Sequence, residues 1–169
     1  MANMSYSGTI LYYVGSVTNE IHKLRRTDGR FFIVPENFVC DACSGASSGK
    51  ACIPEGRYLA SNFRDRTLDA MVRDHVGFSV DLSDIWDPYL RRQRTLLRIH
   101  PDGADPGTAG CVGILSDVAS CRDLLRDLIP GGVIQKLEVY IVDDFWDVPQ
   151  NIEGLQILIN QRNAGVCTP

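Results

Sequence analysis

The sequence lacks any hydrophobic run long enough to cross a bilayer, any internal repeat, and any general excess of positive charge. A transmembrane helix needs about 20 consecutive apolar residues, so we expect no membrane span. The 17 lysines and arginines are outnumbered by 21 aspartates and glutamates, which gives a net charge of −4. Because phosphate contacts require clustered positive charge, we expect no nucleic-acid partner.

The start of the chain also lacks the features of a secretory signal. Residues 1–8 contain neither a basic start nor an apolar core, and a Sec signal peptide has both. We therefore expect a protein made in the cytoplasm without a Sec address.

One local cluster of positive charge is present, formed by Arg91, Arg92 and Arg94. The favoured interpretation is a solvated turn before a strand. The alternative is an electrostatic contact with an anionic substrate or with an acidic partner protein.

The length and pattern of the chain predict one mainly β domain. With 169 residues, of which 44% are hydrophobic, residues 1–169 can bury a single core. Alternation with a period of two dominates, and helical spacing of apolar residues occurs after Ser116, a candidate N-cap. We predict strands at 9–14, 20–24, 31–34, 78–82, 94–99, 133–142 and 152–159, a hairpin turn at 27–30, a loop at 41–50, a loop or short helix at 83–94, and a helix at 116–128.

The most informative feature is a histidine followed, after ten residues, by a cysteine. His100 ends the predicted strand at 94–99, and Cys111 lies in a Gly-Cys-Val-Gly turn beyond a loop rich in glycine and proline. A thiol attacks carbonyl groups as the thiolate, and a neighbouring imidazole is the usual means of forming one near neutral pH. The pair therefore indicates a candidate catalytic dyad, and the alternative is a buried cysteine with an incidental histidine.

The residues around this pair resemble the catalytic signature of L,D-transpeptidases. The element Thr108-Ala109-Gly110-Cys111-Val112 is most similar to the type VI secretion effectors of this family, which carry Thr-Ala-Gly-Cys or Ser-Thr-Gly-Cys. Ala109 replaces the second histidine of most family members, whereas the histidine that acts as the base corresponds to His100. An Ile-Pro-Glu-Gly-Arg-Tyr segment at 53–58 resembles the family's strand entry, and the resemblance covers about residues 50–145.

The resemblance implies a β-sandwich with one or two helices and a peptidoglycan-modifying enzyme. Cys111 would form a thioester with a stem tetrapeptide, and water or an amine would then complete L,D-carboxypeptidase cleavage or D-amino-acid exchange. It also implies an antibacterial effector that acts in the periplasm of a target bacterium, with a cognate immunity protein and a component of the secretion apparatus as partners. No cofactor and no metal are expected for this chemistry.

Gly110 and Thr108 are candidate contributors to the same site. Backbone N–H groups around Gly110 and Cys111 are suitable donors to an oxyanion, because glycine allows close approach of the backbone. The Thr108 hydroxyl is a candidate to orient the substrate or the thiol. A hydroxyl that bonds its own turn is equally consistent with the sequence.

Asp102 and Arg98 are two further candidates. Asp102 is suited to hold the second ring nitrogen of His100, as in a catalytic triad, although an aspartate in Pro-Asp-Gly is more typical of a turn. Arg98 precedes His100 by two residues, so both side chains lie on one face of a strand. Its guanidinium is a candidate partner for a substrate carboxylate or for surface acids.

The other cysteines leave three interpretations open. Cys40, Cys43 and Cys52 provide up to three zinc thiolates, with His22 or His75 as a distant fourth ligand. A disulfide from Cys52 to Cys40 or Cys43 is expected in an oxidising compartment. Buried, reduced thiols are equally consistent, and Cys121 on the helix face is expected in the core. The sixth cysteine is Cys167.

Two rival functions use the same residues differently. One is a cysteine peptidase or amidase with another substrate, which assays with purified stem peptides distinguish. The other is a non-catalytic, cysteine-rich binding module, which metal analysis and thiol titration distinguish.

Overall fold

The computed structural model describes residues 8–46 and 49–165. Its strands are β1 (Thr9–Ile21), β2 (Leu24–Ile33), β3 (Phe38–Ser44), β4 (Gly56–Asp65), β5 (Val72–Arg73), β6 (Val76–Leu82), β7 (Ile85–Asp87), β8 (Arg92–Arg94), β9 (Arg98–Pro101), β10 (Val112–Ile114) and β11 (Gln135–Val142). The helices are α1 (Val118–Leu128) and α2 (Ile152–Gly165), with single 3-10 turns η1 (Val34–Glu36), η2 (Asp69–Met71) and η3 (Phe145–Asp147).

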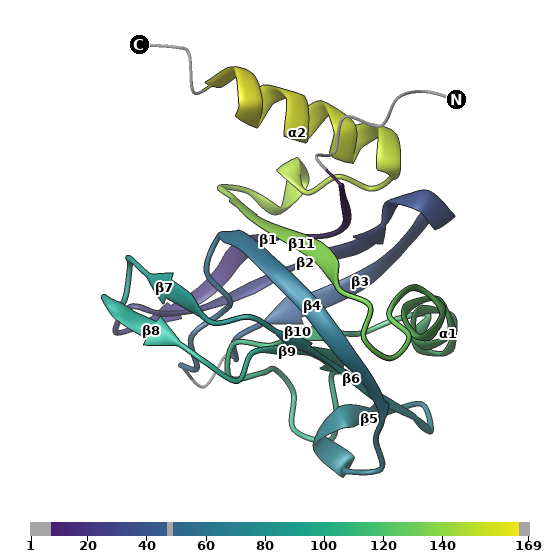
Figure 1. Cartoon of the computed structure of the whole chain (residues 1–169). Coiled ribbons are helices and arrows are strands. Elements are labelled where there is room, and N and C mark those ends of the chain that lie inside the picture. Colours follow the sequence, from purple (N-terminus) through teal and green to yellow (C-terminus); the bar gives the residue numbers. More distant parts are fainter. Residues whose placement is uncertain (1–7, 47–48, 166–169) are drawn as a thin grey trace.

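The strands form one curved sheet in the order β4-β11-β1-β2-β3-β10-β9-β6-β5 (Figure 1). β6 also pairs with β4, so the sheet closes on itself and its two halves face each other across the core. Strands take up 46% and helices 22% of the structure, which confirms the prediction of a mainly β fold with one or two helices.

The strand pairs are antiparallel with two exceptions among the described residues. β1 runs parallel to β11, and β9 runs parallel to β10. The second parallel pair contains His100 on β9, and β10 begins directly after Cys111, so this pairing determines the geometry of the candidate site.

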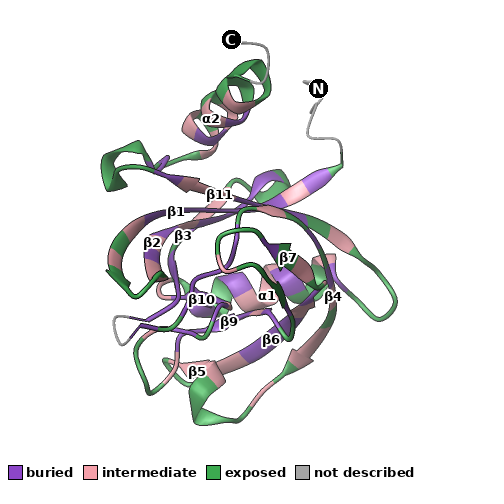
Figure 2. Cartoon of the chain, turned by 90° about the vertical axis from the view of Figure 1, so that its left-hand side faces the viewer, coloured by how far each residue is buried: buried purple, intermediate pink, exposed green. Residues whose placement is uncertain are grey.

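β1 is apolar on both faces because both faces are covered. Leu11 and Tyr13 point into the core of the closed sheet. Tyr12 and Val14 pack in a second cluster outside it, with Leu155 and Ile159 of α2. α2 thus lies outside the closed sheet, with an exposed outer side (Figure 2).

α1 covers one end of the closed sheet and the β7–β8 hairpin lies at the other (Figures 1 and 2). The predicted helical spacing is confirmed, since Val118, Cys121 and Leu125 enter the main core. The predicted N-cap is wrong. Asp117, in a left-handed conformation, occupies the cap position, and the Ser116 hydroxyl instead accepts a hydrogen bond from the backbone N–H of Asp41 at 2.8 Å.

The prediction of a last strand at 152–159 is wrong, because these residues begin α2. The alternating apolar residues of this segment are also compatible with a helix, in which Leu155 and Ile159 lie four residues apart on the buried face. Asn151 starts the helix, since its side chain accepts from the N–H of Gly154 at 2.8 Å.

The predicted hairpin turn at 27–30 lies inside β2, and the actual turn is at His22 and Lys23, both with positive φ. Gly29 is required there for another reason. It lies opposite Gly15, and a Cβ at this position would collide with the Val14 carbonyl oxygen.

The remaining differences concern the segments around the site. β3 extends to Ser44, so the predicted loop at 41–50 begins late, and its residues 47–48 lie outside the described residues. Residues 83–94 form the β7–β8 hairpin rather than a loop or short helix. The predicted strand at 94–99 is interrupted at Leu96, which has a positive φ, and it resumes as β9.

Candidate active site

The parallel pairing of β9 and β10 brings His100, on β9, next to the short strand that begins directly after Cys111. Ile99 is paired with Val112, and His100 with Gly113. Ile99 and Val112 point into the core, so the side chain of His100 points to the outer face of the sheet. Cys111 directly precedes β10, and the backbone N–H of Arg98 is directed at its sulfur.

His100 is held in one orientation by a backbone carbonyl. Its Nδ1 lies 2.7 Å from the carbonyl oxygen of Pro101. Because a carbonyl only accepts, Nδ1 carries the proton and Nε2 retains a lone pair. Burial lowers the pKa of His100, against the Pro101 contact and Asp102, which raise it. The ring is therefore neutral at pH 7 and able to accept a proton.

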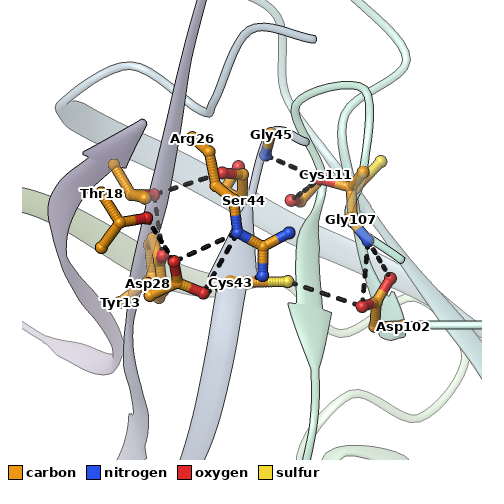
Figure 3. Close-up of polar contacts among 12 residues, drawn as sticks. Tyr13, Thr18, Arg26, Asp28, Cys43, Ser44, Gly45, Asp102, Gly107 and Cys111 are labelled. Atoms are coloured by element: carbon orange, nitrogen blue, oxygen red, sulfur yellow. Dashed lines mark hydrogen bonds and ion pairs between the residues drawn. The ribbon is translucent and has the colours of Figure 1, made fainter. Parts of the chain in front are cut away.

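Asp102 lies in the loop over the outer face and does not hold the histidine ring. Its carboxylate accepts from the N–H of Gly107 at 3.0 and 3.1 Å, and from the thiol of Cys43 at 3.8 Å (Figure 3). These contacts match the turn-forming role of an aspartate in Pro-Asp-Gly. The carboxylate also raises the pKa of the Cys43 thiol to about 12, after burial as the larger cause.

Thr108 binds three backbone groups through one hydroxyl. Its Oγ1 donates to the carbonyl of Cys111 at 2.6 Å, and it accepts from the N–H groups of Gly45 at 3.1 Å and Gly110 at 3.4 Å. One donated and two accepted bonds use the full capacity of a hydroxyl. Thr108 therefore positions the backbone that carries the thiol.

Gly110 is required by conformation and by space. Its φ is +114°, and a Cβ there would collide with Nη2 of Arg94. Arg94 is itself buried, pairs with Asp87 at 2.9 Å, and donates to the carbonyls of Ala51 and Cys52 at 3.0 Å each. One guanidinium thus joins the β7–β8 hairpin, the segment before β4 and the turn before Cys111.

Cys111 is half-buried, and its thiol lies 4.0 Å from the carbonyl oxygen of Leu96. Burial raises the pKa of the thiol, while the backbone N–H of Arg98 and the charges of Arg98 and Arg94 lower it. Within residues 8–46 and 49–165, no hydrogen bond joins the His100 ring to this thiol. Catalytic hydrogen bonds are often long in unliganded enzymes and tighten when substrate binds.

The side chain of Arg98 is engaged away from the thiol. Its guanidinium pairs with Asp81 at 3.2 Å, and Asp81 also pairs with Arg64 at 2.8 Å. Arg98 thus contacts a surface acid through its side chain and the Cys111 sulfur through its backbone.

Sequence reasoning missed Arg94. Arg91, in the turn, and Arg92, at the start of β8, are exposed, but Arg94 is one of the buried residues that hold the site together. Alternation along β8 gives no signal for this, because its partners come from other parts of the chain.

The described cysteines are free thiols, and all except Cys111 are buried. The disulfide from Cys52 to Cys40 or Cys43 is therefore not formed, and Cys121 lies in the core as expected. In residues 8–46 and 49–165 no group of three or more His, Cys, Asp and Glu side chains is arranged to hold a metal ion. Cys167 lies outside the described residues.

Comparison of the chain with protein-family models, with curated proteins and with solved structures finds no match. Among the described residues, neither helix is long and apolar enough to cross a membrane.

The Arg94–Asp87 pair gives a prediction about stability. Replacing Arg94 with Gln leaves the buried Asp87 carboxylate without its charge partner, which is expected to cost about 3–5 kcal/mol of unfolding free energy. Chemical denaturation measures this. Arg92→Gln, on the same strand but exposed, is the control and should change stability by less than about 0.5 kcal/mol. Equal effects of the two substitutions would contradict the bracing role of Arg94.

Proposed function

We propose that the protein is a cysteine-dependent acyl-transfer enzyme acting on peptidoglycan stem tetrapeptides, as an L,D-carboxypeptidase, an L,D-transpeptidase or both. The observation that carries the proposal is the β9–β10 register. It sets the His100 ring on the outer face of β9, next to β10, the strand that begins directly after the half-buried Cys111. The resemblance of residues 100–112 to the L,D-transpeptidase signature supplies the substrate class.

The proposed reaction begins with a neutral pair. Nε2 of His100 takes the proton of the Cys111 thiol as the sulfur forms a bond to the substrate carbonyl carbon. The resulting oxyanion accepts hydrogen bonds from backbone N–H groups at the Gly110–Cys111 turn. His100 then returns the proton to the leaving amine, the C–N bond breaks, and a thioester remains on Cys111.

The second half of the reaction releases the acyl group. Water or an incoming amine attacks the thioester, His100 takes the proton of this nucleophile, and the thiol is restored. Water gives the shortened tripeptide, and a D-amino acid gives an exchanged tetrapeptide. In this mechanism Asp102 and Thr108 shape the loop, and Arg98 supplies the backbone N–H directed at the sulfur.

Purified disaccharide-tetrapeptide tests the reaction directly. Incubation with the protein, with and without added D-amino acids, should remove one alanine mass or replace it by the mass of the added amino acid. Cys111→Ser should abolish both products, because a hydroxyl is a much weaker nucleophile than a thiol. Mass spectrometry measures the products.

The matched control is Cys52→Ala, which removes a buried thiol and leaves Cys111 in place. It should retain activity. If the wild-type protein leaves the tetrapeptide unchanged, the stem-peptide assignment is wrong and another acyl substrate must be considered.

The pKa of His100 gives a pH prediction. His100 must be neutral to act as the base, and burial lowers its pKa from the ordinary value of 6.5. We expect kcat/KM to stay constant down to about pH 6.5 and to fall only at lower pH. A rate that already falls between pH 8 and pH 7 would contradict this assignment.

Removal of the base should change the shape of this pH profile. His100→Gln is expected to lower kcat/KM by about 10²–10⁴-fold. The remaining rate should rise with pH beyond 9, because the pKa of the Cys111 thiol is raised above its ordinary value of 9.0. Unchanged activity in this variant would exclude His100 as the base.

We further propose that the enzyme is an antibacterial effector that acts in the periplasm of a target cell and is neutralised by an immunity protein covering Cys111. Expression with an added periplasmic signal should lyse or swell bacterial host cells that lack the immunity protein, whereas Cys111→Ala should be harmless. Microscopy and viable counts measure this. Equal toxicity of both forms would reject a toxic role for the acyl transfer.

A further inference from the structure

A groove of about 450 Å³ lies beside the turn that carries the candidate nucleophile. Ala109, two residues before Cys111, forms part of its wall, and Arg94, which packs against Gly110, forms another part. The remaining walls are Leu24, the segment 49–51, and Arg92, Gln93 and Thr95 of the β8 region.

The groove is lined by positive charge without a balancing acid. Lys50 and Arg92 are both exposed, and no aspartate or glutamate is among the lining residues. Within residues 8–46 and 49–165 neither of the two side chains forms an ion pair. The charge of Arg94 is already balanced by Asp87.

Such a groove favours an anionic group close to Cys111. Two unpaired cations raise the local concentration of anions, although the net charge of the whole chain is −4. In the proposed reaction, the bond that breaks joins the diaminopimelate residue of the stem tetrapeptide to its terminal D-alanine. The tetrapeptide carries two carboxylates near this bond, one on the diaminopimelate residue and one at the C-terminus of the leaving alanine. Either would enter the groove as a carboxylate.

We propose that Lys50 and Arg92 form a carboxylate-binding subsite for the acyl donor. This inference rests on the proposed function, which it deepens by assigning specificity to two residues. It also gives a role to Arg92, one of the two exposed arginines of the cluster. The two cations fix the donor in the groove while its carbonyl lies over the thiol.

Binding to a Cys111→Ala protein tests the subsite without turnover. Fluorescence polarisation with a labelled disaccharide-tetrapeptide should show about tenfold weaker binding after Lys50→Gln or Arg92→Gln. Arg91→Gln is the matched control, because Arg91 is exposed in the same cluster but does not line the groove. It should leave binding unchanged.

Two amidated peptides identify which carboxylate is bound. One has its C-terminal carboxylate converted to an amide, and the other has the diaminopimelate carboxylate so converted. The peptide that lacks the recognised group should bind about tenfold more weakly to the parent protein. It should no longer respond to Lys50→Gln or Arg92→Gln.

The outcomes separate this inference from the proposed function. The activity assay uses the protein with Cys111 intact. If this protein cleaves the tetrapeptide, but Lys50→Gln, Arg92→Gln and Arg91→Gln leave its KM unchanged, the subsite is wrong and the enzyme assignment stands. If binding depends on Lys50 and Arg92 but no product forms, the subsite stands and acyl transfer is wrong. No measurable binding, or equal loss in all three variants, overturns the subsite.

Discussion

The parallel pairing of β9 with β10 is the constraint on which the candidate site depends. Parallel neighbours are usually joined by a crossover of a dozen or more residues, most often a helix. Here residues 102–111 make the connection without a helix, so the loop must satisfy its backbone polar groups by other means. Asp102 and Thr108 do this by accepting from Gly107, Gly45 and Gly110. Asp102, first considered as a partner of the His100 ring, and Thr108, first considered for orienting the substrate or the thiol, therefore determine the conformation of the loop that carries Cys111.

A second constraint fixes the other side of the turn. The Arg94–Asp87 pair is buried, and burying charge is costly unless both ions are well paired and hydrogen-bonded. Arg94 meets this condition with Asp87 and with the carbonyls of Ala51 and Cys52. Since its guanidinium fills the space beside Gly110, the β7–β8 hairpin and the turn before Cys111 hold each other in place. Arg94 thus gives the groove a buried, charge-paired wall, while Lys50 and Arg92 are exposed to solvent.

The local sequence pattern predicted the secondary structure correctly where only one periodicity fits the apolar residues, as in α1 and β11. It failed where both the helical and the strand periodicity fit. The segment 152–159 satisfies both alternation and helical spacing, and its contacts with Tyr12 and Phe32 on a distant strand pair decide for the helix. Gly29 provides a close approach to the Val14 carbonyl rather than a turn.

In the site, the order histidine, loop, cysteine predicted two neighbouring side chains. The partners of Asp102 and Thr108 at Cys43 and Gly45 lie more than fifty residues away and leave no local trace.

The electrostatics of the pair distinguish between two forms of cysteine chemistry. Burial lowers the pKa of His100 and raises that of Cys111, so the resting pair is a neutral imidazole and a thiol rather than an ion pair. The two positive charges near Cys111 that would stabilise a thiolate are those of Arg98 and Arg94. Both are paired with acids, Arg98 with Asp81 and Arg94 with Asp87. In the proposed reaction, proton transfer would then accompany attack on the carbonyl. A resting thiol is also less reactive than a thiolate toward other electrophiles. An anionic donor held in the adjacent groove would bring its carbonyl to a nucleophile that becomes reactive only at that moment.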